Sequence, residues 1–227
     1  MAARAGPVII GSQEWRELLF IHHRVESTSL RGLVHPSLEI QERDGSAWVS
    51  SAAFTLRRGS VRGLPPLPDF HELNLRTYVT HPRRGPGIWF FSLDAASLTA
   101  VVIARASVRL PYFHARMERG EGWYRSERIS VPASYDAAWT VTGEEHVSTP
   151  GSLNEFLAER YTLYSQALGP VLWCGKVVHE KWPLCEARID KLWQTLPVAA
   201  GFECGPPALA HYTRGVVVDF EPFIPVL

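Results

Sequence analysis

The chain has 227 residues, enough for one large β-rich domain or two small ones, and enough to bury a core without metals or disulfides. Its 23 basic and 23 acidic residues cancel, so it lacks the basic excess with which nucleic-acid-binding proteins neutralise phosphates. No apolar stretch is long enough to span a membrane, and the apolar run 8–10 is too short for a secretion signal. We therefore expect a soluble, cytoplasmic protein with neither nucleic acid nor membrane as a partner.

The numbers and positions of the cysteines and lysines restrict which kinds of site the chain can form. The three cysteines are odd in number and show no C-x-x-C spacing, which indicates neither a disulfide framework nor a zinc ribbon. All but three of the 23 basic residues are arginine. A catalytic lysine that forms a Schiff base has to be Lys176, Lys181 or Lys191.

Segments rich in β-branched and aromatic residues dominate the chain and predict strands. In chain order these segments are 18–25, 47–56, 71–80, 88–93, 112–119, 123–131, 137–141, 171–179 and 216–220. Residues 121–122 are typical of a hairpin turn between the fifth and sixth of them. The proline-rich stretch 63–68 predicts an extended loop.

Three helices are expected between these strands. One covers 27–34, and a second runs to about residue 108 with Asp94 as its N-cap. The third opens with the capping box Ser152-x-x-Glu155 and continues at helical spacing to residue 164. Many strands with few helices predict a β-rich, antiparallel α+β fold, which we assign to one domain with residues 1–13 as an N-terminal extension.

The predicted strand 71–80 carries polar residues on one of its two faces. Alternate side chains of a strand point to opposite sides, which places Leu73, Leu75, Thr77 and Val79 on one face and Glu72, Asn74, Arg76 and Tyr78 on the other. An ordinary half-exposed strand has this pattern. So does a strand whose polar face orients a ligand inside a barrel mouth.

Familiar catalytic motifs and metal motifs are absent from the sequence. The nine histidines include no H-x-H, H-x-x-x-H or H-E-x-x-H pair, and the adjacent His22 and His23 face opposite ways on a strand. We predict no metal and no cofactor, although ligands converging from distant strands stay possible. No G-x-S-x-G, P-loop or G-x-G-x-x-G occurs. Acid–base chemistry by His, Tyr or Glu is the mechanism left open.

Several motifs together resemble the bacterial family known as domain of unknown function 2071. They are residues 70–79 (FHELNLRTYV), 87–94 (GIWFFSLD), 110–117 (LPYFHARM), 151–157 (GSLNEFL), 159–164 (ERYTLY) and 182–184 (WPL). The resemblance extends over about residues 14–220. It implies the fold of acetoacetate decarboxylase, a closed antiparallel β barrel or cone with a few inserted helices around a buried pocket.

The resemblance to the decarboxylase itself is more distant. It implies pocket positions for Arg16 and Glu72, which stand where the enzyme has an arginine and a glutamate. Where the enzyme has a Pro-Lys-Lys sequence, with one lysine forming the Schiff base, this chain has Pro111-Tyr112-Phe113. Neither tyrosine nor phenylalanine supplies the primary amine of an imine. A Schiff base is therefore not expected, unless Lys176 has taken over from another strand.

Two classes of function follow. In the first, an enzyme catalyses enolisation, dehydration, aldol-type or cyclisation chemistry on a carbonyl or carboxylate compound without a Schiff base. Its catalytic candidates are Glu72, Tyr112 and His114, and its substrate-binding candidates are Arg16, Asn74, Arg76 and Tyr78. In the second, the pocket binds or senses a small molecule without chemistry, the lysines having been lost. The resemblance also implies assembly into a homo-oligomer, as in related decarboxylases.

Overall fold

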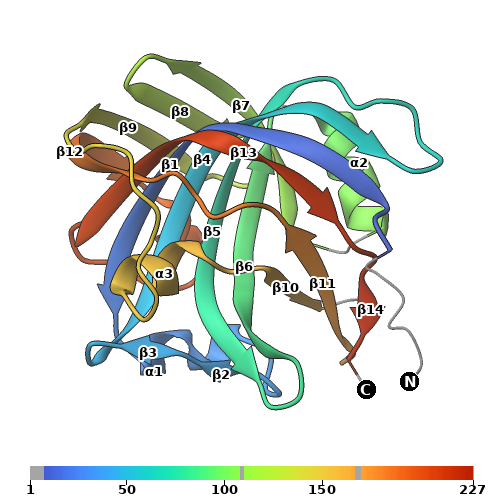
Figure 1. Ribbon diagram of the computed structural model, residues 1–227, viewed down its shortest axis with the longest axis horizontal. Helices are drawn as coiled ribbons and strands as arrows, with labels where there is room; N and C mark the ends of the chain where they lie inside the picture. Colours follow the sequence, from blue (N-terminus) through green and yellow to red (C-terminus); the bar gives the residue numbers. More distant parts are fainter. Residues whose placement is uncertain (1–7, 108–109, 167–169, 227) are drawn as a thin grey trace.

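The structure is a computed structural model that describes residues 8–107, 110–166 and 170–226. Strands dominate it (Figure 1). The strands are β1 Gly11–Val25, β2 Glu39–Ile40, β3 Glu42–Arg43, β4 Ser46–Val61, β5 Phe70–His81, β6 Gly85–Ala95, β7 Tyr112–Gly120, β8 Trp123–Arg128, β9 Ser134–Val141, β10 Thr162–Gln166, β11 Leu172–Val178, β12 Cys185–Gln194, β13 Leu209–Phe220 and β14 Ile224–Pro225. The helices are α1 Ser27–Leu30, a 3-10 turn Arg31–Leu33, α2 Leu98–Ser107, α3 Leu153–Ala158 and α4 Leu196–Ala199.

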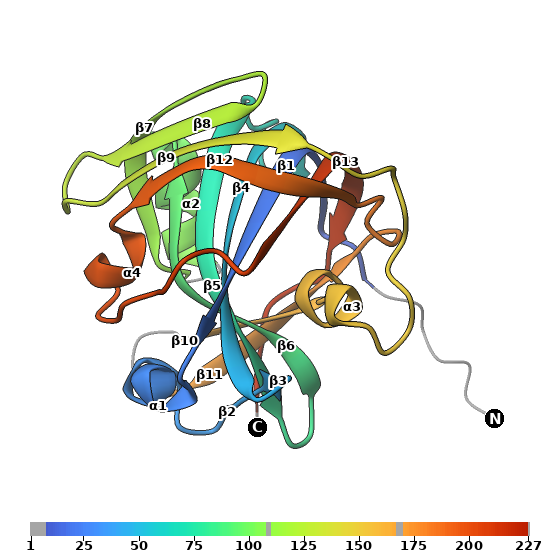
Figure 2. The same ribbon diagram turned by 90° about the vertical axis from the view of Figure 1, so that its left-hand side faces the viewer.

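Two closed rings of strands share β13, β1, β4, β5 and β6. The larger ring adds β7, β8, β9 and β12, and the smaller ring adds β10 and β11. Figure 2 shows the two sets of added strands on opposite sides of the shared ones. A closed, β-rich fold with few helices is thus confirmed. The antiparallel pattern is interrupted where β6 pairs in parallel with β7 and with β10.

Strand β5 separates the interiors of the two rings, which is why both of its faces are buried. Leu73 and Leu75 pack against Tyr124 of β8 and Tyr135 of β9 in the core of the larger ring. The opposite face of β5 looks into the smaller ring. The interpretation of this segment as a half-exposed strand is therefore wrong, because neither face meets solvent.

The helix predictions are confirmed in place but not at every boundary. Ser152 caps α3, since its hydroxyl accepts a hydrogen bond from the Glu155 amide at 3.1 Å. That helix ends at Ala158, so the expected extension to residue 164 is wrong. The chain turns into β10 instead, and Leu163 and Tyr164 of β10 pair with β6.

The prediction that Asp94 caps the second helix is also wrong. Helix α2 begins at Leu98, and the Ser97 hydroxyl accepts from the Ala100 amide at 3.2 Å. Asp94 belongs to the end of β6, where it forms a buried ion pair of 2.8 Å with Arg128. An acidic residue before an apolar run is typical of a helix start, but here the acid pairs across strands.

Strands β10 and β12 were not predicted from the sequence. β12 is half-buried and alternates apolar with charged residues, so it lacks the β-branched content that marks the other strands. The hairpin at 121–122 is confirmed between β7 and β8, with Gly122 at a φ of 71°. The proline-rich stretch 63–68 is confirmed as a loop between β4 and β5.

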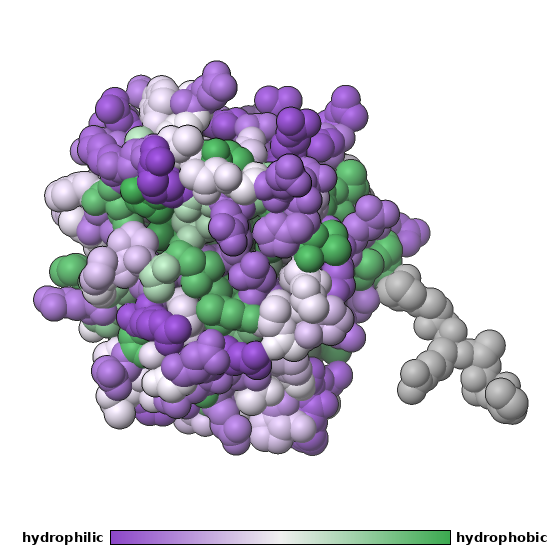
Figure 3. Space-filling model, turned by 60° about the vertical axis from the view of Figure 1, so that its left-hand side comes forward, coloured by the Kyte–Doolittle hydropathy of each residue, from purple (hydrophilic) through white to green (hydrophobic). Residues whose placement is uncertain are grey.

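The surface is mixed in character. Figure 3 shows one face, on which hydrophilic side chains cover most of the area and hydrophobic ones lie in small groups between them. Within the described ranges, none of the helices combines the length and the hydropathy that crossing a membrane requires.

Candidate functional site

A cavity of about 300 Å³ lies inside the smaller ring. Each of the seven strands of that ring contributes lining residues, and α2, the β4–β5 loop and the segment after α3 complete its walls. Most of the lining is apolar. A small number of polar groups in an apolar hollow is the usual composition of a small-molecule site.

Three polar residues of the cavity come from β5, and Gln13, Arg160, His179 and Glu221 add others. Glu72, Asn74 and Arg76 line it from alternate positions of this strand, and each side chain is buried. Tyr112, at the start of β7, lines it as well, and its hydroxyl donates a hydrogen bond of 2.9 Å to Glu72 Oε2. Four of the seven residues predicted for the site are thus brought together around one space.

Burial gives Glu72 an unusual protonation equilibrium. Desolvation raises the pKa of its carboxyl from 4.5 to about 7, and the negative charge of nearby Asp94 acts in the same direction. Hydrogen bonds from Tyr112 and Asn74 lower it, but less than burial raises it. Near neutral pH the group therefore exists in both forms, as a general acid or general base requires.

Two arginines border the cavity without a salt bridge in the described part of the chain, Arg76, which is buried, and Arg160, which is half-buried. Arg76 is 6% exposed, and its Nε and Nη2 have no hydrogen-bond partner there. Its guanidinium lies 5.0 Å from the ring of Phe20. Arg160, just after α3, stacks at 4.5 Å over Phe156, and its Nε is also unpartnered among the described residues. Burial lowers the pKa of both groups.

His179 also lines the cavity and was not among the predicted residues. Its ring lies 4.7 Å from both Tyr161 and Trp182. Burial lowers the pKa of its imidazole, and Nδ1 lies 2.6 Å from the Glu180 carbonyl, so the proton of the neutral ring belongs on Nδ1. No pattern in the sequence indicated this histidine, because it stands alone at the end of a predicted strand.

Three predicted site residues lie elsewhere. Arg16 is half-exposed and pairs with Glu14 at 2.8 Å, while its neighbour Trp15 lines the cavity. Tyr78 is fully buried beyond the cavity, where its hydroxyl lies 2.6 Å from Ser50 Oγ and donates to the Leu157 carbonyl at 2.9 Å. His114, on β7 two residues after Tyr112, is not among the lining residues that the structure describes.

All three lysines of the chain fall in the described ranges, and none lines the cavity. Lys176 is exposed, because its neighbour Val177 takes the inward position on β11. Lys181 donates to the Ser148 carbonyl at 3.2 Å, and Lys191 pairs with Asp136 at 2.6 Å. The alternative of a relocated lysine is therefore wrong for this structure.

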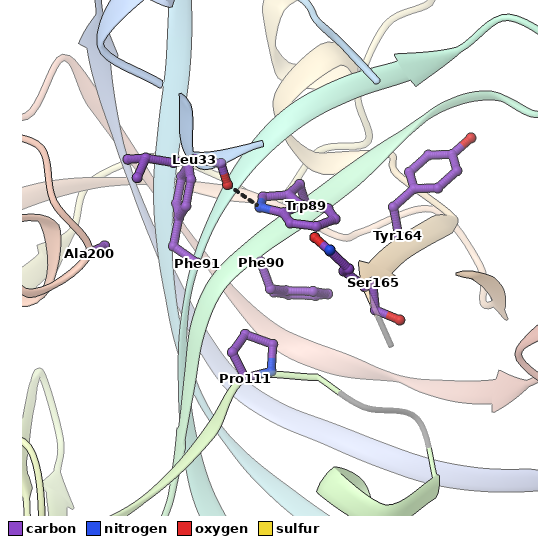
Figure 4. Close-up of a pocket in the computed structure, with 9 residues that line it drawn as sticks. Leu33, Trp89, Phe90, Phe91, Pro111, Tyr164, Ser165 and Ala200 are labelled. Carbon is purple, nitrogen blue, oxygen red and sulfur yellow. Dashed lines mark hydrogen bonds between the residues drawn. The ribbon is translucent and has the colours of Figure 1, made fainter. Parts of the chain in front are cut away.

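A second hollow of about 310 Å³ differs in its chemistry. Figure 4 shows its aromatic wall, in which Trp89 Nε1 donates to the Leu33 carbonyl at 3.1 Å. None of the described residues that line it is acidic, basic or histidine. Across the described ranges, no group of three His, Cys, Asp or Glu side chains is arranged to hold a metal ion. The cavity of the smaller ring, in contrast, is lined by several titratable groups.

Comparison with known sequences gives two matches. The model of the DUF2071 family, described as an uncharacterized conserved protein, matches residues 12–217. The uncharacterized protein YqjF of Bacillus subtilis is 36% identical over 221 residues, which are 92% of this chain and 90% of that protein.

Solved structures with the same fold are far more distant in sequence. The enduracididine biosynthesis enzyme MppR, complexed with pyruvate, is 12% identical with a TM-score of 0.65, covering 99% of this chain and 92% of that one. The acetoacetate decarboxylase of Legionella pneumophila is 11% identical with a TM-score of 0.64, covering 100% and 92%. An acetoacetate decarboxylase-like enzyme from Sphingomonas wittichii is 14% identical with a TM-score of 0.60, covering 99% and 96%.

Proposed function

The chain belongs to the DUF2071 family and has the acetoacetate decarboxylase-like fold, and from that premise we propose that it is an enzyme of acid–base chemistry on a small carbonyl or carboxylate compound. The observation that carries the proposal is Glu72, a buried carboxyl with a pKa of about 7 that faces a cavity. A fold neighbour, MppR, has been solved with pyruvate, a compound that joins a carbonyl to a carboxylate. Fold kinship alone would not assign a reaction.

In the proposed step, the Glu72 carboxylate removes a proton from the carbon next to the substrate carbonyl. The electron pair of the broken C–H bond moves onto the carbonyl oxygen, where the Tyr112 hydroxyl donates a hydrogen bond to the new negative charge. Glu72, now protonated, returns its proton to carbon or to a departing hydroxyl group. This deprotonation is shared by enolisation, dehydration, aldol-type and enol-mediated cyclisation reactions.

Asn74 and Arg76 would fix the orientation of the substrate. Arg76 has unpartnered donors in the described part of the chain and no carboxylate salt bridge, so a substrate carboxylate would satisfy both its charge and its hydrogen-bonding capacity. A chemically inert binding or sensing pocket is the alternative. Such a pocket would have the same cavity but would not require a carboxyl whose pKa lies near neutral pH.

The proposal is tested by proton exchange. The protein is incubated in D2O with pyruvate, 2-oxobutanoate, acetoacetate and any compound that native mass spectrometry finds bound after purification, and deuterium uptake is followed by NMR. We expect Glu72→Gln to slow the exchange about 100-fold or more. Glu118→Gln, at an exposed position of β7, is the matched control. Equal exchange by the wild type and Glu72→Gln would remove Glu72 from the mechanism.

A further inference from the structure

The lining of the cavity is unevenly distributed along β5. Successive inward residues of a strand lie about 7 Å apart, so Phe70, Glu72, Asn74 and Arg76 form a row about 20 Å long. Phe70, at one end of this row, belongs to an apolar cluster with Leu56 and Ala100. Arg76 stands at the other end. The acid–base pair Glu72–Tyr112 therefore lies between an apolar end and a cationic end.

The apolar end is built by two elements that extend over the same side of the cavity. The β4–β5 loop contributes Leu64 and Leu67, and α2 contributes Ala100, Ile103 and Ala104. None of these five side chains offers a hydrogen-bonding group. Figure 1 shows α2 on the opposite side of the molecule from α3. A ligand atom placed here gains stability only through apolar contact.

The cationic end is formed by Arg76 and by Arg160, the second residue after α3. Within the described residues, neither guanidinium has an acidic side chain within ion-pair distance, and both lie mainly against aromatic rings. Glu72, the nearest acid along β5, is partly neutral near pH 7. Arg76 is buried and Arg160 is half-buried, and two such positive charges without an ion pair favour a ligand that brings a negative charge.

From this arrangement we propose that the ligand is an elongated amphiphile: an anionic head at Arg76 and Arg160, its oxygen function at Glu72 and Tyr112, and an apolar body under α2 and the β4–β5 loop. A medium-chain or aromatic oxo acid has this form. The placement of the ligand's oxygen-bearing group at Glu72 and Tyr112 rests on the proposed function. The head and the body follow from the two ends of the cavity alone.

The test compares three probes by calorimetry at pH 7: octanoate, which has head and body, acetate, which has only the head, and 1-octanol, which has only the body. We expect octanoate to bind at least tenfold more tightly than either of the others. Binding should strengthen by up to about fourfold for each buried methylene of the chain. Octanol or acetate binding as tightly as octanoate would overturn the inference.

Two variants on one helix check the position of the apolar body. Ala104→Phe fills the apolar end of the cavity, and Ala106→Phe, at an exposed position outside the lining, adds the same side chain to the surface of α2. We expect Ala104→Phe to weaken octanoate binding at least tenfold and Ala106→Phe to leave it unchanged. Equal effects of the two variants would show that the body does not lie under α2.

The cationic end has its own variant. Arg76→Met should reduce octanoate binding about tenfold or more while leaving octanol binding unchanged, because only the head loses its partner. An unchanged ratio of the two affinities would overturn the position of the head. Arg160→Met repeats this test where the first variant does not fold.

These binding measurements separate the inference from the proposed function. Glu72-dependent deuterium exchange into short oxo acids, together with no octanoate binding, would overturn the amphiphile and leave the chemistry standing. Selective octanoate binding with no exchange into any compound would leave the amphiphile standing and favour a binding module.

Discussion

Replacing Glu72 by glutamine should change how the stability of the protein depends on pH. The folded state holds the pKa of this carboxyl at about 7, whereas the unfolded chain has a value near 4.5. A carboxyl with a raised folded pKa favours the folded state most at low pH. This contribution is full below about 4.5 and is lost as the pH rises through 7.

The size of the effect follows from the two pKa values. Their difference corresponds to about 3 kcal/mol of unfolding free energy, and the side chain is only 4% exposed, so solvent screening removes little of it. Glutamine keeps the acceptor for the Tyr112 hydroxyl but does not ionise. Relative to the wild type, Glu72→Gln should therefore gain about 3 kcal/mol between pH 4.5 and 8.

Urea unfolding of both proteins at half-unit steps from pH 4 to 8.5 measures this difference directly. Glu118→Gln, exposed on β7, controls for the loss of an acidic residue. Wild-type and Glu72→Gln curves that run parallel within about 0.5 kcal/mol over the whole range would refute the reasoning. They would mean that the carboxyl is hydrated in the folded state.

Three further predictions concern the same interior. His211 is buried against His22, and burial lowers the pKa of His211 from 6.5 to about 4. Lowering the pH from 6.5 to 4 should therefore reduce the unfolding free energy by about 3 kcal/mol. His211→Asn should remove this pH dependence, as measured by urea unfolding. Arg76→Met removes a buried charge without a salt bridge in the described residues, so the unfolding free energy of the ligand-free variant should rise by about 1–4 kcal/mol and its melting temperature should rise with it. A lower melting temperature would show that the charge is compensated. Tyr112→Phe removes the hydrogen bond that favours ionised Glu72, so the NMR titration midpoint of Glu72 should rise above that of the wild type. An unchanged midpoint would show that the Tyr112 hydroxyl does not stabilise the Glu72 carboxylate.

The polar row on β5 was readable from the sequence because it depends on one local rule. Alternation along a strand fixes which side chains share a face, and Glu72, Asn74 and Arg76 do share the cavity. Whether that face meets solvent could not be predicted from the sequence. It depends on β10 and β11 closing a second ring, and the sequence of β10 does not have the pattern of a strand.

Residues from other elements show the limits more plainly. Arg16 was assigned to the pocket by resemblance, but β1 shifts register between Arg16 and Leu19, and Glu17 has a φ of 57°. Such a bulge changes which side chain points inward, and no pattern in the sequence marks it. Arg160 was not predicted for the site, because the helical spacing of the sequence continues through it and placed it inside a helix.

Tyr78 illustrates a third kind of limit. It shares the face of Glu72, as alternation requires, yet α3 covers it, and its hydroxyl is satisfied by Ser50 and the Leu157 carbonyl. The face was predictable, but the extent of the cavity along it was not. That extent depends on where a distant helix packs.

The titration of the Glu72 carboxyl carbon tests the central claim most directly. With 13C-labelled glutamate, the signal that is missing from spectra of Glu72→Gln identifies this residue, and its shift is followed from pH 3 to 9. The account predicts a midpoint near 7. A midpoint near 4.5, the ordinary value for glutamate, would contradict it, because the carboxyl would then be ionised and hydrated instead of held between its two forms in the cavity.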